Sequence, residues 1–250
     1  MSDYLMRDAA PFSAEEWQKV DETVVHVARQ YLVGRRFIKL VGPLGAGTEV
    51  VPVGSGESRS MVPLTVIQED LTLAWRDLEA NRKLGLPPEL GPLAQAAAKC
   101  ARAEDELVLG GLIAAAGNKV AIGDWDEPGA ALEDIVAATK ELIASDFYGP
   151  YAIVLSPALY AKTQRVARGM GRMVSKLIQD VAEGGMFQSP LLEDDQGLVV
   201  SLGMPNFDMV VGQDLITGYL GNEGLDHLYR VMESIALRVK RPGAICLLGK

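Results

Sequence analysis

The chain has 250 residues, of which 48% are hydrophobic, and a net charge of −9 at neutral pH. This length allows one large domain or two small ones with a substantial core, while the excess of carboxylates argues against nucleic acid as a partner. The two cysteines form no Cys-x-x-Cys pair, which argues against a disulfide framework. The sequence shows neither a basic leader, which argues against a secretory signal, nor an apolar run of about 18 residues, which argues against a membrane span. A cytoplasmic protein is expected.

The first predicted helix covers residues 13–33. Ser13 and Glu16 form a capping box, in which a hydroxyl and a carboxylate each satisfy a free backbone N–H. Hydrophobic residues then recur at spacings of three and four, which is typical of an amphipathic helix. This apolar stripe consists of Trp17, Val20, Val24, Val27 and Tyr31.

The remaining elements mix helices and strands without regular alternation, which indicates an α+β fold with an antiparallel sheet in the last third. Further helices are predicted at 87–110, 129–145 and 170–183. Strands are predicted at 36–41, 64–74, 151–155, 197–202, 208–211, 229–239 and 244–248. The run 151–155 is apolar throughout, so both of its faces should be covered. The Gly-, Ser- and Pro-rich run 48–63 should form an exposed loop or a short hairpin.

The histidines and glycines indicate no active site. His26 and His227 have no second His or Cys at metal-ligand spacing. The glycines at 45–47 complete neither a dinucleotide fingerprint nor a P-loop. We therefore predict no metal and no cofactor.

Two charged clusters stand out. The triplet Glu104, Asp105 and Glu106 could do acid–base work or collect cations, but neighbouring residues on a helix point in different directions. We expect a solvated face with salt bridges. Arg35 and Arg36, with Lys39 close by, are likewise expected to form a solvated face.

Short strings spread over nearly the whole chain carry a family resemblance. They lie at 11–13, 33–37, 42–45, 75–79, 104–106, 149–157, 187–190, 214–221 and 238–246. Each string alone is weak, but their order along the chain is specific. On these strings the chain resembles the family 1 encapsulins, most closely those whose cargo is a ferritin-like iron oxidase.

The resemblance implies the fold of tailed-phage major capsid proteins, in its encapsulin form. Many copies would close an icosahedral shell around cargo that carries a C-terminal targeting peptide, for iron storage and protection against oxidative stress. The implied parts are an N-terminal helix and arm with a cargo-facing surface at 1–47, an extended loop at 48–74, a peripheral domain at 75–128 and 203–250, and an axial domain at 129–202.

The resemblance also implies two sites. The cargo-peptide groove, carried over by position, would be made by Val24, Ala28, Tyr31, Leu32 and Arg35 with Leu215, Ile216 and Tyr219. From the residues alone, the same helix stripe can pack on the protein's own core, and adjacent faces can do both. A pore is expected within 168–176 and 182–189, with Gly184, Gly185 and Arg172 as candidates.

The chain departs from the family pattern in two places. The extended loop is short at 53–63, and the region after Gly110 is also short. Either the loop is truly reduced, which would weaken or change assembly, or residues of the loop are omitted. No flavin is predicted, because Trp75 does not align cleanly with the aromatic residue that binds it in some relatives.

Two other functions are weighed against a shell protein. A phage or prophage capsid protein that packages DNA would share the fold, but the acidic chain and the N-terminal amphipathic helix argue against it. An enzyme is disfavoured, because no nucleophile and base are paired.

Overall fold

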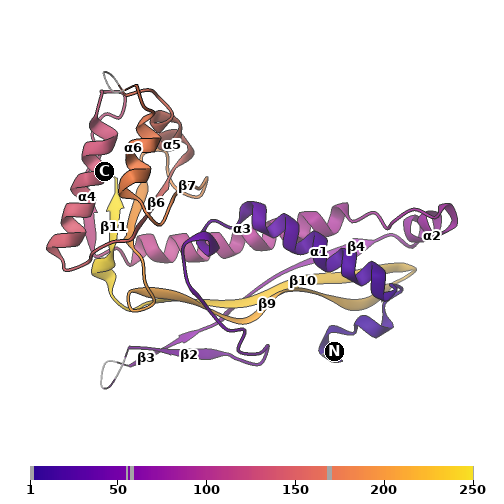
Figure 1. Cartoon of the computed structure of the whole chain (residues 1–250). Helices are drawn as coiled ribbons and strands as arrows, with labels where there is room; N and C mark the ends of the chain where they lie inside the picture. The colour runs from indigo at the N-terminus through magenta and orange to yellow at the C-terminus, as the bar shows by residue number, and fades with distance from the viewer. Residues whose placement is uncertain (1–2, 55, 57–58, 168–170, 250) are drawn as a thin grey trace.

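The computed structural model describes residues 3–54, 56, 59–167 and 171–249 (Figure 1). An elongated unit contains α1, α2, α3, β1, β4, β9 and β10, and a compact unit, which stands at one end of it, contains α4, α5, α6, β5, β6, β7, β8 and β11. Among the described residues, no helix is both long and apolar enough to cross a membrane.

The elongated unit is built on a four-stranded sheet in the order β1–β9–β10–β4. The strands are β1 (Leu40–Val41), β4 (Thr65–Leu73), β9 (Phe207–Glu223) and β10 (Asp226–Val239). β9 and β10 form a long antiparallel hairpin that turns at Gly224, which has a φ of 64°, a backbone conformation suited to glycine. β10 pairs along its other edge with β4, so the predicted antiparallel sheet of the last third is confirmed.

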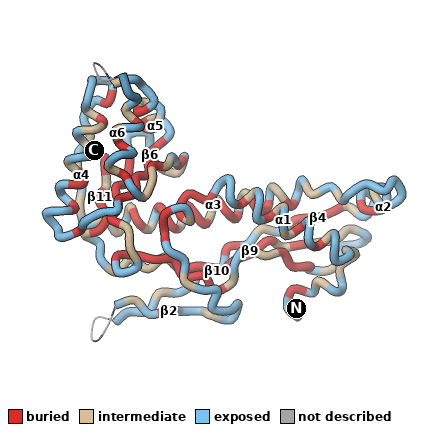
Figure 2. The backbone as a smooth tube through the Cα atoms, viewed as in Figure 1, coloured by how far each residue is buried: buried red, intermediate tan, exposed pale blue. Residues whose placement is uncertain are grey.

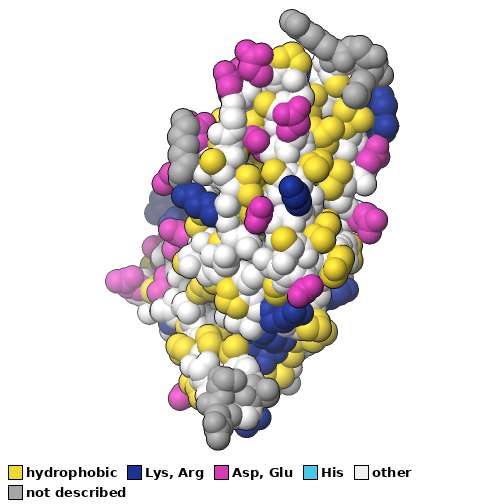
Figure 3. All heavy atoms as spheres, turned by 90° about the vertical axis from the view of Figure 1, so that its left-hand side faces the viewer, with side chains coloured by type: hydrophobic (Ala, Val, Ile, Leu, Met, Phe, Trp, Pro, Cys, Tyr) yellow, Lys and Arg dark blue, Asp and Glu magenta, His cyan; other side chains and the backbone are white. Residues whose placement is uncertain are grey.

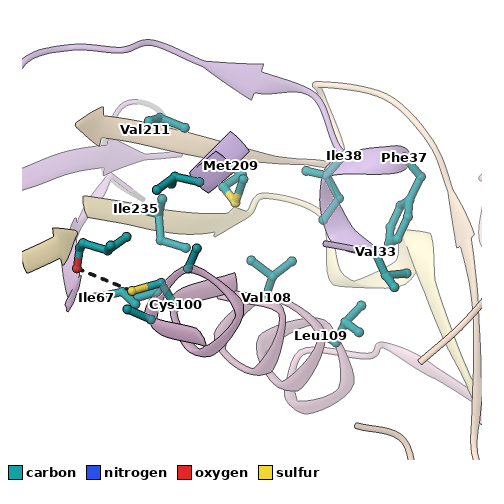
Figure 4. Packing of buried hydrophobic residues seen from close by; sticks show 14 of the residues in the cluster. Val33, Phe37, Ile38, Ile67, Cys100, Val108, Leu109, Met209, Val211 and Ile235 are labelled. Atoms are coloured by element: carbon teal, nitrogen blue, oxygen red, sulfur yellow. Dashed lines mark hydrogen bonds between the residues drawn. The ribbon is translucent and has the colours of Figure 1, made fainter. Parts of the chain in front are cut away.

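Three helices complete this unit. They are α1 (Ala14–Tyr31), α2 (Trp75–Leu84) and α3 (Gly91–Ala114). α3 packs against α1 and also against β4 and β10. The buried residues of this unit accordingly gather along α3 and the sheet beneath it (Figure 2). Figure 4 shows Cys100, Val108 and Leu109 of α3 in this core, together with Met209 and Ile235 of the sheet.

The capping box predicted for α1 is confirmed. Ser13 Oγ accepts from the N–H of Glu16 at 3.2 Å, and the Ser13 N–H donates to Glu16 Oε2 at 2.7 Å. The apolar stripe follows the predicted residues Trp17, Val20 and Val24, which are buried, and Val27, which is half-buried against the same core; further on, Ala28 and Leu32 are buried, whereas Tyr31 is exposed. Spacing alone does not separate these positions, because on a helix of 3.6 residues per turn Tyr31 lies only about 20° and Ala28 about 40° around the axis from Val24.

The compact unit is a five-stranded sheet in the order β5–β11–β8–β6–β7 with three helices. Its strands are β5 (Asn118–Val120), β6 (Tyr151–Leu155), β7 (Met186–Gln188), β8 (Gly197–Ser201) and β11 (Ile245–Leu248), and its helices are α4 (Ala130–Ala144), α5 (Pro157–Thr163) and α6 (Val174–Val181). Ile153 and Leu155 of β6 belong to the same hydrophobic cluster as α4, whereas Ala152 and Val154 join the core of the elongated unit. Both faces of β6 are buried, as its apolar run predicts.

The sheet of the compact unit draws strands from three parts of the chain. β5 and β11 lie in the segments predicted for the peripheral domain, at 75–128 and 203–250, yet both pair within this sheet. β11 pairs with β8 on one side and β5 on the other, because its apolar residues complete the same core. α4 lies at the left of Figure 1, and on the face turned to the viewer in Figure 3 hydrophobic side chains are interspersed with acidic and basic ones.

The region 48–63 forms a hairpin, one of its two predicted conformations. β2 (Val50–Val53) pairs antiparallel with β3 (Ser60–Pro63), and residues 55 and 57–58 between them lie outside the described part. Val51 is buried against Val210 and Ala236. Arg238 Nη1 donates to the carbonyl of Pro52 at 3.0 Å. The base of the hairpin is therefore anchored to the long sheet.

Several predicted boundaries are wrong. The spine helix starts at Gly91, not at residue 87, and continues to Ala114. Only Leu40–Val41 of the predicted strand 36–41 pairs, because a 3₁₀ turn at Gly34–Arg36 takes up the start of that segment. β9 extends twelve residues past the predicted strand 208–211, ending at Glu223. Its polar and glycine-rich second half lacks the alternation that identifies a strand, and it is held by pairing with β10.

Candidate functional site

A groove lies beside the C-terminal half of α1, and its volume is about 380 Å³. Its lining consists of Val25, Ala28 and Arg29 of α1, the capping residue Leu32 with Arg35 and Arg36 just after the helix, and Asp214 and Leu215 of β9. The residues from α1 follow the spacing i, i+3, i+4, i+7, so they form one face of the helix. This face is rotated from the face that packs in the core.

The floor of the groove is apolar. Ala28 and Leu32 are buried together with Ala101 of α3, and Leu215 packs against them from β9. Val25 stands at the edge with 40% of its surface exposed. The groove thus offers a small hydrophobic surface with charged groups around it, a combination typical of sites that bind an amphipathic ligand.

Arg35 is the most highly bonded charged group of the groove. Its Nε donates to Glu104 Oε1 at 2.8 Å, and its Nη2 donates to Glu104 Oε2 at 2.7 Å and to Glu233 Oε2 at 2.9 Å. Nη1 donates to Asp214 Oδ1 at 2.7 Å. One guanidinium therefore ties together α3, β9, β10 and the segment that follows α1.

Burial makes this cluster electrostatically unusual. The side chains of Glu104 and Glu233 are each 1% exposed, whereas Asp214 is 55% exposed. Burial opposes the charge of Arg35, but its hydrogen bonds and ion pairs with Glu104 and Asp214 outweigh this and raise its pKa, so it stays a cation. Burial, and then the charge of Glu104, raises the pKa of Glu233 to about 9. Both effects favour the protonated form of Glu233.

Asp105 fixes the corner between α1 and Arg35. Its carboxylate accepts from the N–H groups of Val33 at 2.6 Å and Gly34 at 2.8 Å. A Cβ on Gly34 would lie 3.0 Å from Val108 Cγ1 and 3.2 Å from Asp105 Oδ1, so the close approach favours glycine. Burial raises the pKa of Asp105 to about 6, although the two backbone donors counteract it.

The acidic triplet is not the predicted solvated face. Glu104 and Asp105 are buried, and only Glu106 is exposed. α3 packs against other elements on several sides, and the two carboxylates are compensated by Arg35 and by backbone N–H groups. The basic cluster differs in the same way: Arg36 and Lys39 are exposed as predicted, but Arg35 is enclosed by carboxylates.

The structure brings together four of the eight residues predicted for the cargo groove. These are Ala28, Leu32, Arg35 and Leu215. The other four lie elsewhere: Val24 is buried in the main core, Tyr31 lines a neighbouring hollow with Arg102 and Ser189, Ile216 is half-buried outside the groove, and Tyr219 is buried beside Tyr229 and His227. Their role as groove lining is not supported by this geometry.

Sequence reasoning missed Val25, Arg29, Arg36 and Asp214 as groove residues. Val25 and Arg29 carried a usable signal, since they share the spacing of Ala28 and Leu32. Asp214 carried none, because its distance from α1 in the sequence is bridged only by the packing of β9.

The candidate pore residues lie in the compact unit. A Cβ on Gly184 would meet the carbonyl oxygen of Tyr151 at 2.8 Å, and Gly185 has a φ of 104°. Internal packing and backbone conformation thus account for both glycines. Arg172 pairs with Asp180 at 3.1 Å on the surface. Residues 168–170 of the predicted stretch lie outside the described residues.

Within the described residues, no group of three or more His, Cys, Asp or Glu side chains is placed to hold an ion. His227 Nδ1 lies 3.0 Å from the hydroxyl of Tyr219, and His26 Nε2 lies 3.1 Å from Gln30 Nε2. The two histidines are thus involved in local contacts in different parts of the elongated unit.

Comparison with known proteins identifies a family. Residues 1–236 match the family model described as encapsulating protein for peroxidase. A type 1 encapsulin shell protein of Myxococcus xanthus is 39% identical, over 99% of this chain and 97% of its own length. A diheme-cytochrome-encapsulin shell fusion protein of Kuenenia stuttgartiensis is 32% identical, over 94% of this chain and 72% of its own length.

Solved structures establish the fold. A virus-like particle from Pyrococcus furiosus matches with a TM-score of 0.81 at 20% identity, covering 94% of this chain and all of that chain. The capsid of the Myoviridae phage XM1 matches with a TM-score of 0.66 at 14% identity, covering 85% of this chain and 90% of that one. At these identities the likeness concerns the fold alone, and it confirms the predicted phage-capsid architecture.

The match to the Myxococcus xanthus protein also bears on chain length. That alignment spans 278 positions, whereas this chain has 250 residues, so at least 28 positions have no residue here. Such internal shortening agrees with the family departures noted at 53–63 and after Gly110. How the missing positions are divided between these two regions stays a prediction.

Proposed function

The chain belongs to the encapsulin family, whose model is described as encapsulating protein for peroxidase. From this premise we propose that the shell formed by this chain encloses a ferritin-like iron oxidase in the cytoplasm. The chain itself is a structural shell protein of a nanocompartment and not an enzyme. The cargo would supply the oxidation, and the shell would contain the stored iron and limit oxidative damage.

The groove beside α1 is the proposed docking site for a C-terminal targeting peptide of the cargo. The observation that carries this proposal is the joint placement of an apolar floor, made by Ala28, Leu32 and Leu215, and a charged wall, made by Arg35 and Asp214. An extended peptide can bury small apolar side chains on such a floor while its backbone pairs with the polar wall. Many weak contacts of this kind would add by avidity when the cargo is itself an oligomer.

The choice of a ferritin-like cargo rests on relatives. A protein of Pyrococcus furiosus that is 30% identical over 58% of this chain is named a ferritin-like-encapsulin shell fusion. The Kuenenia stuttgartiensis fusion joins a diheme cytochrome instead, and the family description names a peroxidase. A ferritin-like oxidase is therefore one of three redox proteins that the test must distinguish.

We also propose functional parts within the shell subunit. The elongated unit would serve as the peripheral domain, the compact unit as the axial domain, and the β2–β3 hairpin as a reduced extended loop. The pore would then lie at the end of the compact unit, with Arg172 near its opening and the turn at Gly184 and Gly185 further from it.

Co-purification of a reporter with assembled shells tests the cargo proposal. The shell is co-expressed with a pool of fluorescent-protein fusions. Each fusion ends in the C-terminal segment of a ferritin-like protein, a cytochrome or a peroxidase. Shells are isolated by size, and the retained segments are identified by sequencing. We expect segments from ferritin-like proteins to be enriched, and Val25→Asp in the groove to abolish their retention.

Val136→Asp on α4 is the matched control, because Val136 is a helical valine with 47% exposure, close to the 40% of Val25. This variant should retain the reporter as the parent shell does. Equal retention by Val25→Asp shells would contradict the groove assignment. Enrichment of cytochrome or peroxidase segments alone would contradict the ferritin-like cargo.

A further inference from the structure

Two buried carboxyl groups share a single guanidinium directly behind the groove. Glu104 of α3 and Glu233 of β10 both accept from Nη2 of Arg35, at 2.7 and 2.9 Å. Their side chains are almost fully buried. Oε1 of Glu233 has no hydrogen-bond partner among the described residues. Together with Asp214, three carboxyl groups thus share one cation.

This arrangement favours a proton on one of the two buried groups. Two carboxylates side by side in a medium of low polarity repel each other, and one cation between them cannot compensate both. Glu104 binds Arg35 through both oxygens, whereas Glu233 makes a single bond and keeps one free oxygen. The geometry therefore favours Glu233 over Glu104 as the site of the proton, and burial and the charge of Glu104 raise the pKa of Glu233 in the same direction.

Each element packed around Glu233 brings ionisable groups toward it. α3 contributes the carboxylate of Glu104 and the thiol of Cys100, and β9 contributes Asp214. The segment after α1 contributes Arg35. Glu69 of the neighbouring strand β4 acts on the same thiol as Glu233 does and is paired with Lys99 at 3.2 Å. Arg35 is thus the cation that contacts Glu233 directly.

An irregularity in the sheet places Glu233 beside the groove wall. Met232 pairs with Ile216, and the next regular partners are Ser234 and Gln213, so the register shifts at Glu233. On β9, Asp214 and Leu215 lie within the same irregular stretch, and both line the groove. Bulges of this kind redirect side chains and interrupt strand pairing. The protonated carboxyl and the groove wall therefore share the least regular part of the β9–β10 hairpin.

We propose that Glu233 keeps a proton in the folded shell, that this proton lets Arg35 hold the polar wall of the groove in place, and that loss of the proton releases cargo peptide. This inference rests on the proposed function of the groove and adds its regulation. When Glu233 ionises, two buried anions compete for Arg35, and the bond from Arg35 to Asp214 at the groove surface weakens. Peptide binding is then linked to one proton.

The proton itself is tested without any peptide. Infrared spectra of assembled shells are recorded from neutral to alkaline pH, because a protonated carboxyl has a C=O stretch that a carboxylate lacks. We expect a band in the parent shell that disappears in the alkaline range and is missing from Glu233→Gln shells. Glu69→Gln, on the adjacent strand, should keep the band. A parent spectrum that matches the Glu233→Gln spectrum at neutral pH would overturn the proposal.

The link to binding is tested with a synthetic peptide copied from a segment that the co-purification selects. Its affinity for parent shells should fall by up to tenfold per pH unit once Glu233 ionises, and its affinity for Glu233→Gln shells should lose this alkaline dependence. An affinity for parent shells that does not change with pH would overturn the regulation and leave the docking function intact. Failure of every peptide to bind at any pH would overturn both, while the infrared band would still show whether Glu233 holds a proton.

Discussion

The two units of the subunit differ in what they bury. Every buried charged residue of the described chain, namely Glu104, Asp105, Asp208 and Glu233, belongs to the elongated unit. The buried polar residues of the compact unit between β5 and β8 are instead serines and threonines, such as Ser156 and Thr163. A buried hydroxyl group is satisfied by one or two backbone groups at little cost, whereas a buried charge needs a charged partner or several hydrogen bonds.

This difference shows where the fold depends on long-range polar contacts. Arg35 and Glu233 are separated by 198 positions in sequence, and their contact fixes the wall of the groove. In the compact unit, the buried hydroxyl groups bond to backbone carbonyls over shorter spans: three positions from Thr163 to Tyr160 and 38 from Ser156 to Asp194. The elongated unit is thus specified by a few costly contacts, and the compact unit by apolar packing.

The largest predicted effect comes from removing one buried partner in each unit. Glu104→Ala leaves Arg35 with incomplete compensation and should reduce the free energy of unfolding by about 3–5 kcal/mol. Ile135→Ala opens a cavity under α4 and should cost about 2–5 kcal/mol. The two buried cysteines report on each unit separately: Cys100 lies one turn from Glu104, and Cys246 shares a hydrophobic cluster with Ile135.

Thiol labelling measures this difference. Burial raises the pKa of Cys100 to about 12 and that of Cys246 to about 11, so neither thiol should react in the folded parent. Glu104→Ala should speed the labelling of Cys100, and Ile135→Ala that of Cys246. The exposed neighbours provide the controls Glu106→Ala and Val136→Ala, each expected to change stability by less than about 0.5 kcal/mol. Simultaneous labelling of both thiols in either variant would mean that the units unfold together.

A second prediction concerns pH and again separates the units. The pKa of Glu233 is about 9 in the folded protein, above the ordinary value of 4.5, so the unfolded chain loses this proton first as the pH rises. The contribution of Glu233 to stability is therefore fully present below about pH 4 and is lost as the pH rises toward 9. From about pH 7 to 8 the loss amounts to about 1.4 kcal/mol per pH unit.

Denaturant midpoints of parent and Glu233→Gln shells across this range check the sign. The free energy of unfolding of the Glu233→Gln variant should not show this decline. If the variant is less stable than the parent at neutral pH, the difference between them should narrow as the pH rises; if it is more stable, the difference should widen. Asp105, with a pKa of about 6, adds a decline of the same sign between about pH 4 and 6. A parallel pH dependence of the two proteins between pH 7 and 8 would contradict the protonation of Glu233.

The sequence predicts the compact unit better than the groove. The apolar run of β6 and the periodicity of α4 indicate both elements and their burial, because each pattern is local. Glu104 and Asp105 were expected on a surface, since nothing in the neighbouring residues reveals that Arg35 and the N–H groups of Val33 and Gly34 reach them. Charges that are compensated across the fold carry no local signal.

The family resemblance assigns to one groove residues that the structure places on different surfaces of α1. Ala28, Leu32 and Arg35 line the groove described here, whereas Val24 is buried in the core and Tyr31 lines a neighbouring hollow. Successive residues of a helix are rotated by about 100° around its axis, so residues of the core face and of the groove face are interleaved along the sequence. Which face borders the groove is decided by the position of β9, and only the structure contains that information.

The smallest predicted effect compares the helix caps of the two units. Ser156, at the start of α5, is fully buried; its hydroxyl donates to the carbonyl of Asp194 at 2.6 Å and accepts from the N–H of Leu159 at 3.2 Å. Ser13, at the start of α1, is exposed. Ser156→Ala leaves the buried N–H of Leu159 and the part-buried carbonyl of Asp194 without this partner and should cost about 1–3 kcal/mol. Water can replace the hydroxyl in Ser13→Ala, which should cost about 0.5–1 kcal/mol. Denaturant midpoints at constant pH compare the two, and an equal or reversed order would mean that burial of the capped groups does not set the cost of losing a cap.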